Sequence, residues 1–137
     1  MTTSILTRTD LAGPYRINAE RAITIQSEVT ENSIPLSVLV LSEDVAADLK
    51  ALGQALSFPE HFGANFDALY DCLCDASVIN SANLVLIFEQ ATRWPEEERD
   101  TLIAVLQAVS DEWREQNRGF WVLFNAPKLD LDPLPTL

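Results

Sequence analysis

Three aspartates spaced four residues apart are the side chains of this sequence best placed to do chemistry. Asp67 and Asp71 fall on one face of a helix predicted from Phe66 to about Cys74, after Asn65, a favourable N-cap residue, and Asp75 extends the row if the helix runs that far. The opposite face carries the apolar residues of a core-facing helix, which are Phe66, Leu69, Tyr70 and Leu73. Like charges at this spacing destabilise a helix by about 0.2–0.5 kcal/mol per pair. The row is either a solvated face, the commoner cause of such a pattern, or a stripe of negative charge prepared for a cationic partner.

Catalytic use of these carboxylates is a weaker hypothesis. Asp67 and Asp71 could act as an acid and base pair in a small acidic hydrolase, but successive helix turns project both into the same solvent. His61 is the only histidine of the chain, and no serine near it suggests a nucleophile elbow. The sequence therefore predicts a protein that is not an enzyme.

The two cysteines offer no metal or redox site. Cys72 and Cys74 are too close together to staple a small fold, and no further cysteine or second histidine completes a zinc pattern. We expect Cys72 at the flank of the core and Cys74 exposed, with no disulfide between them. The chain has four glycines and no glycine-rich phosphate loop. No metal ion and no cofactor are expected, and the scarcity of cysteine favours a reduced, cytoplasmic setting.

The charge of the chain suits a cationic partner. Its formal net charge is −12, from 21 acidic and 9 basic residues, so nucleic acid and anionic membranes are poor partners. No apolar run is long enough to span a membrane. No Lys or Arg lies between Lys50 and Arg93. The acids of this segment are Glu60, Asp67, Asp71, Asp75 and Glu89.

Short apolar runs predict the strands that position these residues. Leu36–Leu41, Leu84–Phe88 and Phe120–Phe124 are typical of strands buried on both faces, and helical patterns separate them. We therefore predict an α/β fold with a three-stranded parallel sheet flanked by helices. Ser42 is expected to cap the helix after the first strand, and Pro95 is expected to open the helix before the third.

The same patterns divide the chain. Residues 35–126 form the predicted domain, residues 1–34 an N-terminal extension of uncertain structure, and residues 127–137 an irregular tail with three prolines. Within the extension, Arg21–Thr30 could be a strand or a short helix that begins at Asn18.

Residues 58–73 (FPEHFGANFDALYDCL) resemble the signature of the barstar family, intracellular inhibitors of the ribonuclease barnase. The family pattern is a loop started by proline, two aromatic residues and glycine, then asparagine, an apolar residue, Asp-Ala-Leu, an aromatic residue, aspartate and Cys-Leu. The order of strands and helices extends the resemblance over roughly residues 36–125. It implies a barstar-like fold and a 1:1 inhibitor of a basic extracellular, barnase-like ribonuclease, without catalysis or cofactor.

The resemblance also implies roles for single residues. Asp71 matches the central carboxylate that occupies the phosphate site of the enzyme, and Asp67 matches a second acid. Tyr70 stands where the family usually has Trp, and His61 stands where barstar has Tyr. A further acid is expected on the later helix, where Asp111 or Glu112 could serve. The implied partner-binding residues are His61, Phe62, Gly63, Asn65, Asp67, Tyr70, Asp71, Asp75, Asp111 and Glu112.

One departure from the family pattern leaves the partner open. Barstar has Gly-Trp just after this helix, whereas this chain has Cys74-Asp75-Ala76-Ser77. An alternative is therefore an immunity or regulatory protein that binds a different cationic toxin or partner through the same acidic surface.

Overall fold

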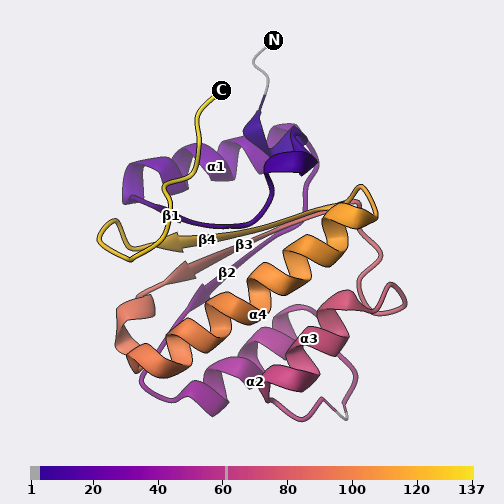
Figure 1. Cartoon of the computed structure of the whole chain (residues 1–137), viewed down its shortest axis with the longest axis vertical. Coiled ribbons are helices and arrows are strands. Elements are labelled where there is room, and N and C mark those ends of the chain that lie inside the picture. The colour runs from indigo at the N-terminus through magenta and orange to yellow at the C-terminus, as the bar shows by residue number, and fades with distance from the viewer. Residues whose placement is uncertain (1–3, 61) are drawn as a thin grey trace.

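A four-stranded parallel sheet lies between two layers of helices in the computed structural model, which describes residues 4–60 and 62–137 (Figure 1). The spatial order of the strands is β1-β4-β3-β2. Their bounds are β1 (Pro14–Ile17), β2 (Leu36–Val40), β3 (Asn83–Glu89) and β4 (Gly119–Asn125). The parallel pairing of the three predicted strands is confirmed. The predicted number of strands is wrong, because β1 pairs with β4 and adds a fourth.

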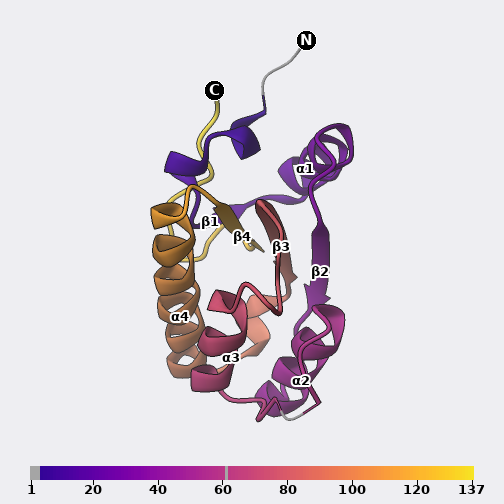
Figure 2. The same cartoon turned by 90° about the vertical axis from the view of Figure 1, so that its right-hand side faces the viewer.

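Each face of the sheet has its own core. Figure 2 shows α1 on the opposite side of the sheet from α3 and α4. The helices are α1 (Ala19–Glu31), α2 (Val45–Ala55), α3 (Phe66–Cys74) and α4 (Glu96–Glu115). In β4, Phe120, Val122 and Phe124 pack in the core shared with α2, α3 and α4. Trp121 and Leu123 pack in the core beneath α1, and burial on both faces explains the continuous apolar runs.

The N-terminal segment is part of this fold. The side chain of Asn18 accepts a hydrogen bond from the backbone N–H of Arg21 (2.7 Å), which caps α1. The helical alternative for this segment is therefore the one that the chain adopts. Ala22, Ile25 and Val29 pack α1 against the sheet.

The C-terminal tail runs along β1. The backbone N–H of Arg16 donates to the carbonyl of Asp132 (2.9 Å), and that of Leu134 donates to the carbonyl of Arg16 (3.1 Å). The guanidinium of Arg21 donates to the carbonyls of Leu134 and Pro135. The tail has no named strand, yet it covers the outer edge of β1, which would otherwise expose unpaired backbone groups.

Asp48 ties the start of α2 to the loop that precedes it. The prediction that Ser42 caps this helix is wrong, because α2 begins two residues later and Asp44 is the N-cap, accepting from the N–H of Ala47 (3.0 Å). Ser42 instead donates its backbone N–H (2.7 Å) and its hydroxyl (2.9 Å) to the Asp48 carboxylate. The indole Nε1 of Trp94 donates to the same carboxylate (2.8 Å). Pro95 likewise lies one residue before its helix, at the N-cap of α4.

We predict that Asp48→Ala lowers the free energy of unfolding by about 2–3 kcal/mol, because three donors lose their acceptor and Trp94 is buried. Urea unfolding followed by tryptophan fluorescence measures the change. Glu43→Ala, an exposed acid in the same loop, is the control and should stay within about 0.5 kcal/mol of the parent protein. Equal stabilities for the two variants would contradict the prediction.

Candidate functional site

The helix that carries the aspartates is fixed at both ends. At its start the side chain of Asn65 accepts a hydrogen bond from the backbone N–H of Ala68 (2.8 Å). At its end the indole Nε1 of Trp113, on α4, donates to the carbonyl of Leu73 (2.9 Å). Leu69 and Leu73 are fully buried between the sheet and the neighbouring helices. α3 is therefore a rigid support whose orientation is set by the core.

All three aspartates are exposed, and two of them have carboxylates without a hydrogen bond or ion pair among the described residues. Asp67 and Asp71 lie on the exposed face of α3. The ion pairs among the described residues are Arg8–Asp10 and Arg114–Asp111, so neither carboxylate has a cationic partner there. Asp75 differs, because it is the C-cap of α3 and its Oδ1 accepts from both the N–H and the hydroxyl of Ser77. These hydrogen bonds lower the pKa of Asp75 and direct its carboxylate into the turn after the helix.

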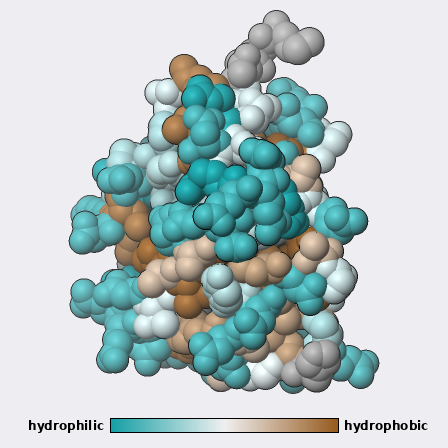
Figure 3. All heavy atoms as spheres, turned by 45° about the vertical axis from the view of Figure 1, so that its right-hand side comes forward, coloured by the Kyte–Doolittle hydropathy of each residue, from teal (hydrophilic) through white to brown (hydrophobic). Residues whose placement is uncertain are grey.

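An apolar groove separates α3 from α4. Phe66 and Tyr70 line it from α3, opposite Ala104, Val105 and Ala108 of α4. Asp67 and Asp71 also line this groove, so the two free carboxylates lie beside apolar surface. Figure 3 shows a band of hydrophobic surface that crosses this face of the molecule between two hydrophilic regions. The arrangement suits a partner that presents cations next to apolar or flat aromatic groups.

The structure distinguishes the two acids predicted on the later helix. Asp111 accepts hydrogen bonds from Gln107 and Arg114 of its own helix, each at 2.9 Å. Glu112 lies close enough to α3 to act on Tyr70. The pKa of Tyr70 is raised first by Cys74 and by desolvation, and then by the negative charges of Glu112 and Asp71. Of the two acids, Glu112 therefore shares a surface with Asp71.

The loop before α3 packs against α2. The rings of Phe58 and Phe62 meet edge to face, 5.0 Å between centroids. A Cβ atom on Gly53 would lie 2.7 Å from the ring of Phe62, so only glycine at this position lets the ring approach α2. Phe62 is therefore half-buried, while Gly63 and Asn65 are exposed. His61, which was also predicted to bind the partner, lies outside the described residues.

The structure also brings in residues that the sequence did not single out. Arg118 stacks on Trp113, with its Cζ atom 3.8 Å from the ring centroid. Its guanidinium donates to the carbonyls of Ile79 and Ser81, in the segment that follows α3. Arg118 therefore holds the far end of the acidic surface, although it lies more than 40 residues along the chain from α3.

A comparison with protein families agrees with this geometry. The model of the family described as barstar (barnase inhibitor) matches residues 42–125, more than half of the 137 residues. The chain belongs to the barstar family. The match covers α2, α3, β3, α4 and β4, and it includes Asp67 and Asp71. No curated protein matches the chain in a separate comparison.

Barstar-family proteins are inhibitors, and the described residues of this member show neither a metal cluster nor a membrane span. Across residues 4–60 and 62–137 no three His, Cys, Asp or Glu side chains are grouped to hold a metal ion. No helix in the described part of the chain is both long and apolar enough to cross a membrane.

Both thiols of this barstar-family protein are free and half-buried. The prediction that Cys74 is exposed is wrong, because α3 turns it toward Tyr70 and α4. Burial raises the pKa of the Cys74 thiol, and Glu112 and Asp71 raise it further. Burial raises the pKa of Cys72, and Asp71 and Asp75 raise it further. Asp71 therefore acts on both thiols, whereas Glu112 acts on Cys74.

We predict that Glu112→Gln speeds alkylation of Cys74 by iodoacetamide at pH 8 and leaves Cys72 unchanged. Loss of the negative charge lowers the pKa of Cys74 and increases the fraction of reactive thiolate at this pH, so faster alkylation is expected. Peptide mapping by mass spectrometry follows each cysteine. Asp111→Asn is the control and should change neither rate. An equal effect of the two variants on Cys74 would show that Glu112 does not face α3.

Proposed function

We propose that this protein inhibits a basic ribonuclease by placing α3 in its active site, with Asp71 and Asp67 where RNA phosphate would bind. The observation that carries the proposal is the pair of exposed carboxylates, without cationic partners among the described residues, on a helix held by the core. Family membership supports an inhibitor of this kind. The expected site of action is the cytoplasm, as a 1:1 complex, with no nucleic acid or membrane involved.

The chemistry of such a contact is complementary. A ribonuclease binds phosphate through Arg, Lys and His in a concave site, and a carboxylate can accept the same charge-assisted hydrogen bonds. Asp67 and Asp71 repel each other in the free protein, and cations of the partner would relieve that repulsion. Since α3 is fixed by Asn65 and Trp113, little conformational entropy is lost when the complex forms.

The proposed contact extends beyond the two aspartates. Glu112 adds a third negative charge from α4, close enough to act on Tyr70, and Tyr70 lines the groove together with Asp71. We assign the later-helix acid of the interface to Glu112, because Asp111 is paired with Arg114. The loop residues His61, Phe62, Gly63 and Asn65 complete the proposed surface, and Asp75 lies at its end.

An alternative partner class keeps the same surface. Tyr70 in place of the usual Trp, and Asp75 bonded to Ser77 after the helix, alter the rim that meets the enzyme. A protein with this rim could act as an immunity protein against a different cationic toxin. Inhibition of purified basic ribonucleases, measured on RNA, separates the two possibilities.

We predict that Asp71→Ala weakens inhibition of the cognate ribonuclease more than any other single substitution in residues 59–75. Removing one side of a buried charge pair costs about 2–5 kcal/mol, a general range that includes complexes of this family, and this corresponds to at least roughly a 30-fold loss of affinity. The melting temperature should stay equal or rise slightly, because repulsion with Asp67 disappears. Titration of ribonuclease activity and a thermal melt measure the two effects. Asp111→Ala is the matched control and should inhibit like the parent protein.

We predict that added salt slows association of this protein with the ribonuclease more than it changes dissociation of the complex. From low to high ionic strength we expect the association rate with the ribonuclease to fall by about tenfold or more, while dissociation changes less, because opposite charges steer the encounter. Stopped-flow fluorescence measures both rates. The double variant Asp67→Asn, Asp71→Asn should show a shallower dependence. Association rates of the parent protein that do not change with salt would indicate an apolar interface.

A further inference from the structure

A second hollow lies at the opposite end of α4, where β3 and β4 end. Its volume is about 460 Å³. The 3-10 turn η3 (Ala91–Arg93), the first turn of α4 and the segment after β4 enclose it. The lining residues used below are Thr92, Arg99, Ala126, Lys128, Leu129 and Asp130. None of them lines the groove between α3 and α4.

Two positively charged side chains, Arg99 and Lys128, line this hollow. Arg99 and Lys128 take no part in the ion pairs among the described residues, although the chain has 21 acids for 9 bases. The Nε of Arg99 is buried and has no acceptor among the described residues, while its Nη1 donates only to the carbonyl of Trp94 (3.3 Å). The other Nη atom of Arg99 makes no hydrogen bond among the described residues, so the guanidinium has donors left for an oxyanion in the hollow.

The place of the hollow in the sheet favours ligand binding. From β1 the chain continues to α1 on one face of the sheet, and from β3 it continues to α4 on the other. The hollow lies at the carboxyl ends of β3 and β4, which are neighbouring parallel strands of the sheet. Crevices of this kind are the usual ligand sites of open α/β sheets.

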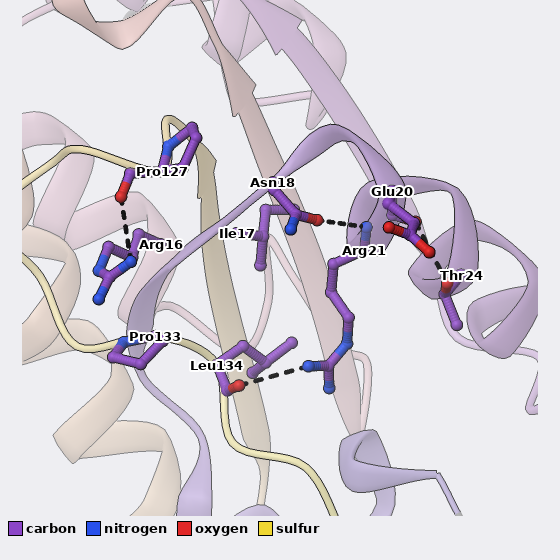
Figure 4. A pocket seen from close by; sticks show the side chains of 9 residues that line it. All are labelled: Arg16, Ile17, Asn18, Glu20, Arg21, Thr24, Pro127, Pro133 and Leu134. Atoms are coloured by element: carbon purple, nitrogen blue, oxygen red, sulfur yellow. Dashed lines mark hydrogen bonds between the residues drawn. The ribbon is translucent and has the colours of Figure 1, made fainter.

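A neighbouring hollow across Pro127 contains two more arginines, but its cations are already occupied (Figure 4). Arg16 donates to the carbonyls of Pro127 and Leu131, and Arg21 donates to those of Leu134 and Pro135. These bonds fasten the C-terminal tail. Of the four cations that line the two hollows, Arg99 and Lys128 are therefore the two that do not hold the C-terminal tail.

We propose that the hollow at the ends of β3 and β4 binds a small organic anion, with its phosphate or carboxylate group on Arg99 and Lys128. Ala126 and Leu129 offer apolar surface to the body of such a molecule. Asp130 also lines the hollow and opposes a second negative charge, which limits the ligand to one oxyanion group. The site is independent of the ribonuclease surface, because the two share no lining residue.

Titration of ¹⁵N-labelled protein with inorganic phosphate and with acetate, at constant ionic strength, tests the proposal and separates the two anion types. We expect saturable amide shifts at Thr92, Ala126 and Leu129 with at least one of them. Arg99→Gln should weaken binding at least tenfold, whereas Asp130→Asn should tighten it. Arg93→Gln, an exposed cation of η3 that does not line the hollow, should have no effect.

Three results would overturn the site: no saturable shifts with either anion, equal affinities for Arg99→Gln and Arg93→Gln, or shifts spread over all cationic surfaces. If Arg99→Gln fails to fold, Lys128→Gln, at an exposed position, and Asp130→Asn carry the test in its place. Ribonuclease inhibition by Lys128→Gln should equal that of the parent protein. Loss of the anion site and failure of the inhibitor proposal are therefore distinguishable.

Discussion

A parallel sheet that is apolar on both faces has to be covered on both, and the rest of this structure depends on that constraint. α1 and the N-terminal turns cover one face, while α2, α3 and α4 cover the other. The second layer buries Leu69 and Leu73 completely. Because α3 buries its apolar side in the core, Asp67 and Asp71 lie on its outer, solvent-exposed side. The acidic surface is therefore a consequence of the way the sheet is covered.

The carboxylates of Asp67 and Asp71 are held in fixed positions because α3 is anchored at both ends. Charges on a flexible segment would lose conformational entropy on binding, whereas α3 is fastened by the Asn65 cap and the Trp113–Leu73 hydrogen bond before any partner arrives. The groove next to it places apolar surface beside the carboxylates. Under the proposed function, charge would govern the rate of encounter, and the fixed geometry would govern how well the partner fits.

The part of the chain outside the family match has its own structural role. The match covers residues 42–125, whereas β1, α1 and the tail lie beyond it. α1 forms the second core with Trp121 and Leu123, and the tail covers the edge of β1 through Arg16 and Arg21. β1, α1 and the tail complete the sheet and its cover. The tail also contributes Lys128 to the hollow at the carboxyl ends of β3 and β4.

The sequence by itself determined the features that depend on local patterns: three parallel strands as apolar runs, the Asn65 cap, and the two aspartates opposite Leu69 and Leu73. It did not determine β1, whose four residues carry no periodic signal and become a strand only by pairing with β4. Nor could it tell which of Asp111 and Glu112 lies nearer to α3, because successive residues differ in direction by about 100° around a helix and only packing against α3 fixes that rotation. The contacts of Asp48 with Trp94 and of Trp113 with Leu73 join residues about 40 or more positions apart, so tertiary structure alone decided them.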